Sequence, residues 1–161
     1  MTATFMHPQI LRIGGGAIDT TAATLAQVGG RYPLVVTDPA MAELPAFGRL
    51  TRALDDAGVA YGTFTGVVPD PTTTAVDEGV AAYRDGGHDS MIAFGGGSSL
   101  DTAKAIGILL GGGGAMRDWK VPAAPDVPVP PLLAIPTTAG TGSEVTKVTV
   151  ITDVETEEKM L

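Results

Sequence analysis

A run of strand-forming residues meets three consecutive glycines and then a helical segment in the middle of the chain. Residues 90–94 are mostly apolar, glycines follow at 95–97, and residues 99–110 are rich in Ala, Ile and Leu. Glycines carry no Cβ, so another molecule can lie directly on this backbone. A helix that begins at Ser98 or Ser99 leaves its first N–H groups unpaired and partially positive. The stretch predicts either a seat for a phosphate or pyrophosphate, or simply a tight turn with Ser98 as helix N-cap.

Strand-length apolar runs alternate with helical segments along the chain. The runs cover residues 33–38, 59–64, 90–94, 132–135 and 147–152, and the helices are expected at about 19–28, 44–57, 72–85 and 99–110. This alternation predicts βαβ units and a Rossmann-like parallel sheet with helices on both faces. We expect residues 9–13 to add an edge strand, which is a candidate surface for pairing two copies in a homodimer.

Charge and composition limit the partners of the chain. Its 161 residues are the length of about one domain. Ten Lys and Arg against 18 Asp and Glu give a net charge of -8, which argues against nucleic acid and anionic membranes. The chain has no cysteine, so disulfides and thiolate metal sites are excluded. It has no run of about 18 apolar residues and no signal peptide pattern, so we expect a cytoplasmic protein.

Two common phosphate-binding templates fit the chain poorly. Gly14-x-Gly16 follows residues 9–13, and Asp38 comes 22 residues later, as in the dinucleotide fingerprint. The third glycine position is Asp19, however, and an aspartate there would repel a pyrophosphate. The P-loop needs a Gly-Lys pair, and the chain has none. The N-terminal glycines are therefore the weaker candidate.

A second segment rich in glycine and hydroxyl groups follows residues 132–135. It reads Pro-Thr-Thr-Ala-Gly-Thr-Gly-Ser-Glu over residues 136–144, and the first segment reads Gly-Gly-Gly-Ser-x-x-Asp-x-x-Lys over residues 95–104. Both follow apolar strands, so in a parallel sheet both lie at its carboxyl edge. Their hydroxyls and glycines suit a ribose and a diphosphate.

In tandem these two segments resemble the signatures of the iron-containing (metal-dependent, group III) alcohol dehydrogenase family, over nearly the whole chain. The resemblance implies a nicotinamide cofactor. The cofactor-binding residues that it implies are Gly95, Gly96, Gly97, Ser98, Thr137, Thr138, Thr141 and Lys159. Asp38 would face the adenosine ribose, where a carboxylate accepts hydrogen bonds from ribose hydroxyls and repels a 2′-phosphate. We therefore predict NAD in preference to NADP.

Asp101 and Lys104 lie three positions apart on the expected helix. One interpretation is an ion pair within the helix, with Asp101 favourably placed in the first turn. The other makes Asp101 a catalytic residue near the nicotinamide. The sequence leaves both open for Asp101 and favours the ion pair for Lys104. Glu144 is expected to anchor a helix start or a loop.

The family implies a metal that this chain is not expected to hold. Members bind Fe²⁺ or Zn²⁺ through an aspartate and three histidines in a helical C-terminal domain. This chain has only His7 and His88, both expected in surface or loop positions. A catalytic metal needs at least three protein ligands.

We therefore expect residues 1–161 to be the dinucleotide-binding domain of a longer dehydrogenase, which transfers a hydride between an alcohol or carbonyl substrate and the nicotinamide. Alone, the domain would bind NAD without turning over alcohols. The alternatives are a stand-alone nucleotide- or phosphate-binding module without catalysis, and a related glycerol or aldehyde reductase with the same cofactor half.

Overall fold

Four parallel strands form the central sheet of the computed structural model, which describes residues 8–123 and 126–161. In sequence order they are β1 (Pro33–Val36), β2 (Gly62–Phe64), β3 (Ser90–Gly95) and β4 (Leu132–Pro136). In space the order is β2-β1-β3-β4, and all the pairings are parallel. Every residue of β1 and β3 is buried, as continuous apolar runs in central strands require. The predicted parallel sheet is confirmed.

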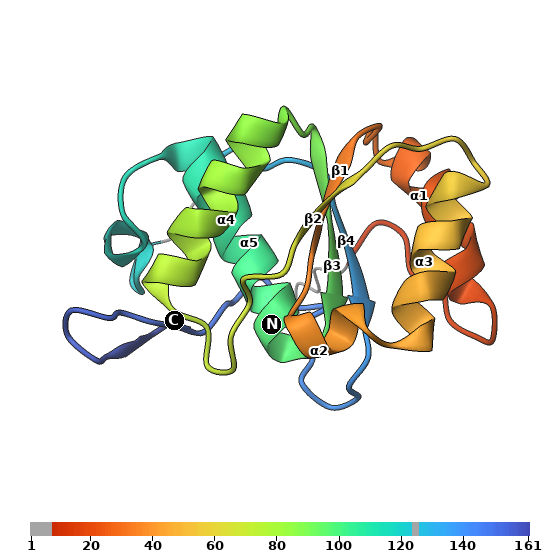
Figure 1. Ribbon diagram of the computed structural model, residues 1–161. Helices are drawn as coiled ribbons and strands as arrows, with labels where there is room; N and C mark the ends of the chain where they lie inside the picture. The colour runs from red at the N-terminus through yellow and green to blue at the C-terminus, as the bar shows by residue number, and fades with distance from the viewer. Residues whose placement is uncertain (1–7, 124–125) are drawn as a thin grey trace, which may run out of the picture.

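Helices cover both faces of this sheet (Figure 1). They are α1 (Thr21–Gln27), α2 (Pro39–Ala42), α3 (Pro45–Asp55), α4 (Thr73–Gly86) and α5 (Gly97–Gly112), with short 3-10 helices η1 (Ala17–Thr20) and η2 (Met116–Trp119). Helices α4 and α5 lie on one side, and α1 and α3 on the other. The helices on both faces were predicted. No helix of the described residues is long and apolar enough to cross a membrane.

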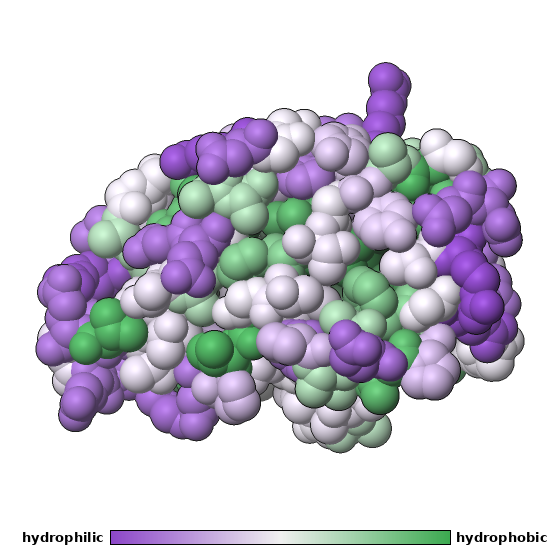
Figure 2. All heavy atoms as spheres, viewed as in Figure 1, coloured by the Kyte–Doolittle hydropathy of each residue, from purple (hydrophilic) through white to green (hydrophobic). Residues whose placement is uncertain are grey.

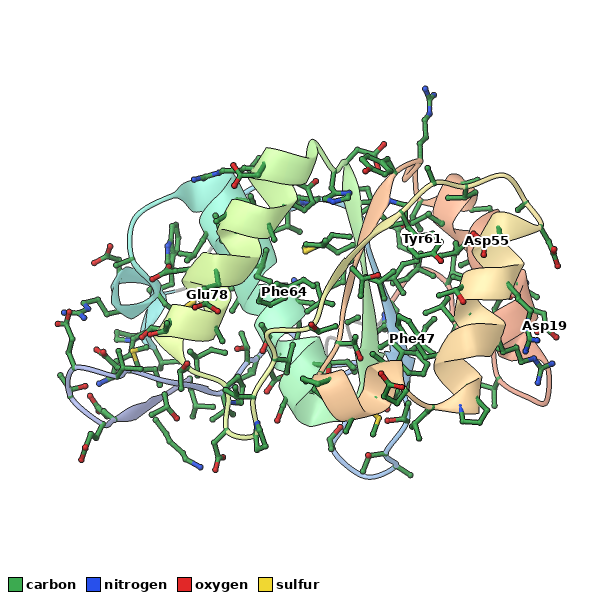
Figure 3. All side chains as sticks on the ribbon, viewed as in Figure 1. Asp19, Phe47, Asp55, Tyr61, Phe64 and Glu78 are labelled. Atoms are coloured by element: carbon green, nitrogen blue, oxygen red, sulfur yellow. The ribbon has the colours of Figure 1, made fainter. Side chains whose placement is uncertain are left out.

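Alternate side chains of the strands point to opposite faces of the sheet and belong to two separate hydrophobic clusters. In β3, Met91 and Ala93 belong to the cluster under α4 and α5, and Ile92 and Phe94 to the cluster under α1 and α3. Phe47 of α3 meets Phe94 edge to face, with 5.5 Å between ring centroids. Phe47 is labelled in Figure 3, between α3 and the sheet. Figure 2 shows hydrophilic side chains gathered over the two sides of the molecule and more apolar ones between them.

A carboxylate joins the starts of the two central strands. Asp89 accepts hydrogen bonds from the backbone N–H groups of Arg31 (3.0 Å) and Tyr32 (2.8 Å) and from the Ser90 hydroxyl (2.7 Å). Burial alone would raise the pKa of Asp89, but these hydrogen bonds outweigh it and hold the pKa below its ordinary value. The ionised carboxylate therefore fixes β1 beside β3.

Two predicted strands are absent or much shorter. Residues 9–13 form no strand and leave Leu11 and Ile13 exposed, so the expected edge strand is wrong. Of residues 147–152, only β5 (Ile151–Thr152) forms, paired antiparallel with β6 (Lys159–Met160). The reason is local competition. The Val148 carbonyl accepts from Lys104, and the Val150 N–H donates to Asp101, so this backbone is bound to α5 instead of to a neighbouring strand.

Candidate functional site

The strand order places a topological switch point at the carboxyl ends of β1 and β3. From β1 the sheet continues to β2 on one side, and from β3 it continues to β4 on the other. The turns that follow β1 and β3 therefore diverge, and in open α/β sheets ligands bind at such a switch point. Thr37 and Asp38 follow β1 there, and the glycine turn follows β3.

The glycine turn leaves the N-terminus of α5 without a side-chain cap. Helix α5 begins at Gly97 with Gly96 as N-cap, so the predicted start at Ser98 or Ser99, with Ser98 as N-cap, is wrong. The Ser98 hydroxyl is therefore free of the capping role, and the first N–H groups of a 16-residue helix, at this switch point, have no side-chain acceptor. Gly95 has a φ of 143°, and a Cβ there would lie 2.4 Å from Ser99 Oγ, so only glycine fits.

The loop after β4 lies against this turn. The backbone N–H of Thr137 donates to the carbonyl of Gly95 at 2.9 Å. Cβ atoms on the next two glycines would lie 3.4 Å from Thr138 Oγ1 and 3.3 Å from Thr141 Cγ2. The structure thus brings together the two segments that the sequence analysis paired, with a backbone cradle between them that side chains would narrow.

Asp38 caps a short helix that the sequence analysis missed. Its Oδ1 accepts from the Met41 backbone N–H at 2.9 Å, and Pro39 occupies the first turn of α2. Asp followed by Pro is a helix-start signal that could have predicted α2. The Met41 sulfur lies 3.6 Å from Thr137 Oγ1, so α2 contacts the loop after β4. The turns after β1, β3 and β4 are therefore linked to one another.

Two buried hydroxyls in the segments that follow β1 and β3 have no hydrogen-bond partner in the described part of the chain. They are Thr37 Oγ1 and Ser99 Oγ, and both residues are almost completely buried. Buried polar atoms usually have partners, so these two offer hydrogen bonds to water or to a ligand. Together with the glycine cradle and the uncapped helix, they fit a dinucleotide.

Asp101 and Lys104 form the expected ion pair, nearly buried. Lys104 Nζ lies 2.9 Å from Asp101 Oδ1, with the two side chains 14% and 11% exposed. Asp101 Oδ2 accepts from the Val150 N–H at 3.1 Å, and Lys104 Nζ donates to the Val148 carbonyl. Asp101 Oδ2 therefore holds Val150 against α5 directly, while Oδ1 acts only through its ion pair with Lys104, which binds the Val148 carbonyl.

Two other candidates lie apart from the glycine turn. Lys159 is on β6, where its Nζ lies 2.7 Å from Asp70 Oδ1 in an exposed ion pair. The structure shows no contact between Lys159 and the cradle. Glu144 has one buried oxygen, Oε2, without a hydrogen-bond partner among the described residues, and it lines a cleft beside β4.

The described residues do not fit a metal centre. No three His, Cys, Asp or Glu side chains of residues 8–123 and 126–161 are grouped closely enough to hold an ion. His88 packs against the rings of Tyr32 and Tyr83, with centroid distances of 4.4 and 6.1 Å, and its Nδ1 lies 3.3 Å from the Tyr32 carbonyl. His7 lies outside the described residues.

The N-terminal glycines do not form the dinucleotide fingerprint. Gly14 and Gly16 follow no strand of the sheet and lead into η1. Asp19 is bound by Arg49, whose Nε lies 2.6 Å from Asp19 Oδ1, and this hydrogen bond lowers the pKa of Asp19. The segment therefore lacks the strand that would aim its glycines at a ligand.

Comparisons with known proteins agree on one family. The sequence model of the family described as iron-containing alcohol dehydrogenase matches residues 8–161. The chain is 39% identical over 160 residues to the NAD-dependent methanol dehydrogenase of Bacillus methanolicus, covering 99% of this chain and 42% of that protein.

Solved structures show the same likeness. A 1,3-propanediol oxidoreductase matches with a TM-score of 0.94 and 33% identity, over 99% of this chain and 42% of that one. A sulfoacetaldehyde reductase from Bifidobacterium kashiwanohense, in complex with NAD⁺, matches with a TM-score of 0.85 and 29% identity, over the same shares. The chain thus spans less than half the length of these relatives.

Proposed function

The chain belongs to the iron-containing alcohol dehydrogenase family, and we propose that residues 1–161 are the part of such an enzyme that binds and orients NAD. One observation carries the proposal: the uncapped start of α5, the glycine turn and the loop after β4 converge at the switch point between β1 and β3. The NAD dependence of the methanol dehydrogenase and the NAD⁺ bound to the sulfoacetaldehyde reductase support it.

The pyrophosphate would rest on the first turn of α5. Backbone N–H groups of Gly96, Gly97 and Ser98 would donate to its oxygens, and the helix dipole favours the negative charge. Thr138 and Thr141, whose side chains lie within 3.4 Å of where a Cβ on Gly96 or Gly97 would be, would line the diphosphate and nicotinamide side together with Thr137. A glycine is needed in the cradle because each Cβ would occupy space that the phosphate requires.

Asp38 would bind the adenosine ribose. Met41 N–H already holds Oδ1, which leaves Oδ2 to accept from ribose hydroxyls. A carboxylate at this point would repel a 2′-phosphate, so the proposed cofactor is NAD and not NADP. For Lys159 to reach a ribose, its Nζ must leave Asp70. An exposed ion pair permits this because it contributes at most about 1 kcal/mol.

Asp101 is proposed as a positioning residue. Its carboxylate is shared between Lys104 Nζ and the Val150 N–H, so it is occupied in fixing residues 148–150 on α5. The catalytic role considered from the sequence would require one of these contacts to be released. We favour a role in which Asp101 holds the shape of the site beside the glycine turn.

In the whole enzyme, the proposed reaction is hydride transfer between a small alcohol or its carbonyl product and the nicotinamide. The bound cofactor supplies or accepts the hydride, and the residues described above bind and orient it. The metal that the family name implies finds no ligand set among the described residues, so its site and most substrate contacts are proposed to lie elsewhere in the enzyme.

Titration of the chain with NADH and NADPH, followed by cofactor fluorescence, tests this proposal. We expect saturable NADH binding, weaker NADPH binding, and loss of both in Gly97→Asp because a carboxylate would occupy the cradle. Gly48→Asp is the matched control, since a Cβ on that helical glycine meets open space.

Equal NADH affinity in Gly97→Asp and Gly48→Asp would contradict the assigned cradle. Absence of NADH binding by the folded chain would contradict the proposed function. Alcohol oxidation by this chain with added Fe²⁺ or Zn²⁺ would contradict the assignment of the metal site elsewhere.

A further inference from the structure

Met41 differs from the other methionines that the structure describes because its side chain is partly exposed. The chain has six methionines, of which Met1 and Met6 lie outside the described residues. Three others are buried in the cluster under α4 and α5, namely Met91, Met116 and Met160. Because a dissolved oxidant reaches a sulfur through solvent, Met41 is the described methionine that we expect to oxidise most readily.

The sulfur of Met41 lies where three segments of the candidate site meet. Met41 is in α2, and its backbone N–H donates to Asp38 Oδ1 at 2.9 Å. Its Cγ lies 3.6 Å from where a Cβ on Gly95 would be, and its Sδ lies 3.6 Å from Thr137 Oγ1. The side chain also packs against the cluster under α1 and α3. These contacts place the sulfur between the glycine turn and the loop after β4.

The contact between Met41 and Thr137 is a weak hydrogen bond with a fixed direction. A thioether sulfur is a weak acceptor and has no proton to donate, so the Thr137 hydroxyl is the donor. Thr137 is exposed, and its hydroxyl is free to rotate from the sulfur to an oxygen of a bound dinucleotide. The unoxidised sulfur therefore leaves this donor available to the cofactor.

Oxidation of the sulfur would change the competition for the Thr137 hydroxyl. Methionine sulfoxide is polar where methionine is apolar, and its oxygen is a stronger acceptor than a thioether sulfur. The added oxygen would be bonded to the atom that already accepts from Thr137, so the hydroxyl would donate to it instead of to the dinucleotide. Thr137 would then face the cofactor with lone pairs alone, and phosphate oxygens cannot donate to them.

We propose that Met41 is a redox modification site that regulates the cofactor site: hydrogen peroxide converts its thioether to the sulfoxide, which binds the Thr137 hydroxyl and weakens dinucleotide binding. The sulfur attacks one peroxide oxygen, so that an S–O bond forms and the O–O bond breaks. Sulfur loses two electrons, and the second oxygen leaves as water with the proton of the first. Methionine sulfoxide reductases reverse the change. The regulatory effect rests on the proposed function, because it takes Thr137 as part of the cofactor site.

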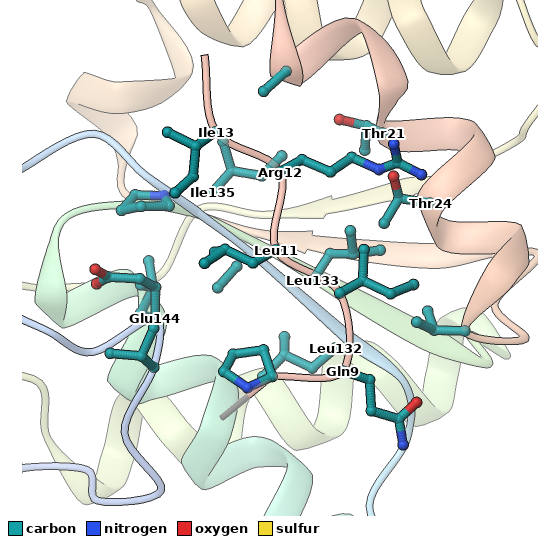
Figure 4. A pocket seen from close by; sticks show the side chains of 18 of the residues that line it. Gln9, Leu11, Arg12, Ile13, Thr21, Thr24, Leu132, Leu133, Ile135 and Glu144 are labelled. Carbon is teal, nitrogen blue, oxygen red and sulfur yellow. The ribbon is translucent and has the colours of Figure 1, made fainter. Parts of the chain in front are cut away.

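Few other groups of the chain compete for the peroxide. The chain has no cysteine, whose thiolate would react with it. The cleft of about 780 Å³ beside β4 has no methionine among the described residues that line it (Figure 4). A loss of NADH affinity after peroxide treatment is therefore not expected to arise in that cleft.

Peptide mass spectrometry and NADH titration of the same samples test the inference. The chain is treated with hydrogen peroxide, the peroxide is removed, and the fraction of each methionine that has gained one oxygen is measured. We expect Met41 to oxidise ahead of the three buried methionines. The NADH affinity should fall about fivefold or more as Met41 oxidises, which corresponds to one lost hydrogen bond. Treatment with methionine sulfoxide reductase should restore it.

Three variants separate Met41 from the rest of the chain. Met41→Leu keeps an apolar side chain of similar volume without the sulfur, so its NADH affinity should be the same before and after peroxide. Met116→Leu is the matched control, because it removes a buried sulfur and should stay as sensitive to peroxide as the wild type. Thr137→Val keeps the shape of threonine without the hydroxyl, so oxidation of Met41 should no longer change its NADH affinity.

Unchanged NADH affinity with Met41 fully oxidised, or an equal loss in Met41→Leu, would overturn the inference. Faster oxidation of any buried methionine than of Met41 would do the same. The methyl NMR resonance of Thr137, recorded without cofactor, should shift on oxidation of the wild type and stay in place in Met41→Leu. That shift, together with no NADH binding by the untreated chain, would confirm the modified contact and contradict only the proposed function. Absence of the shift would refute the capture of Thr137.

Discussion

Replacing Asp38 with asparagine should move the cofactor preference toward NADPH without disturbing the fold. Asparagine is as good an N-cap as aspartate, so the Met41 N–H keeps its acceptor. The change removes only the charge. At about 4 Å, two like unit charges repel by ~1 kcal/mol in water and by ~4 kcal/mol at an effective dielectric of 20. Asp38 is partly buried, so we take a repulsion of ~2 kcal/mol between its carboxylate and a 2′-phosphate. Removing this repulsion changes the ratio of the NADH and NADPH dissociation constants about thirtyfold.

Asp38→Ala provides the comparison, because it removes the charge and the cap together. Fluorescence titrations of the three proteins with both cofactors should show the same shift in preference for the two variants. Thermal unfolding should show a loss of about 1 kcal/mol in Asp38→Ala alone. If Asp38→Asn keeps the wild-type ratio of the two dissociation constants, the carboxylate does not face the ribose 2′ position and the argument fails.

Three further tests use changes at Gly95 and Gly97, at Lys104, and at Asp89. Gly95→Ala should lower the melting temperature, because residue 95 has a positive φ and its Cβ would collide with Ser99. Gly97→Ala should keep the melting temperature and weaken NADH binding about tenfold. Equal losses of melting temperature in the two variants would contradict this reasoning. Lys104→Met should lower the free energy of unfolding in urea by about 2–3 kcal/mol, because it leaves the nearly buried Asp101 carboxylate without its cation. Adding Asp101→Leu should recover part of that loss. Asp89→Asn should lower stability at neutral pH by about 1 kcal/mol, discounted for exposure. Because the pKa of Asp89 is lower in the folded protein, the stability difference between wild type and Asp89→Asn should persist at pH values above the ordinary pKa of 3.8. It should vanish as the pH falls through the folded pKa. A stability difference that does not change with pH would contradict this prediction.

Local patterns were sufficient to predict the sheet and the convergence at its carboxyl edge. Continuous apolar runs identify buried parallel strands, and parallel strands bring their following turns together, so residues 95–104 and 136–144 could be paired from the sequence. The exact start of α5 could not, because glycine and serine are both acceptable N-caps. Whether the predicted residues bind the cofactor stays a prediction.

Two predicted strands were wrong because contacts with distant parts of the chain decide how their backbone is bound. Residues 148–150 have β-branched side chains, but two groups on α5, the Asp101 carboxylate and the Lys104 ammonium, bind their backbone. Residues 9–13 alternate like a strand, yet a cleft separates them from β4. The local sequence does not show which neighbouring strand or helix a strand-like segment will bind.

The cradle at the start of α5 has a consequence for ionic strength. None of the residues assigned to it at 95–98 and 137–141 is basic, and the chain as a whole carries a net charge of -8. A phosphate held by lysines is released as salt screens them, but backbone dipoles at close contact are screened little. Salt should instead weaken the general repulsion between an acidic protein and an anionic dinucleotide. NADH affinity should therefore stay level or rise between low and physiological salt, which is the reverse of the behaviour of a lysine-lined nucleotide site.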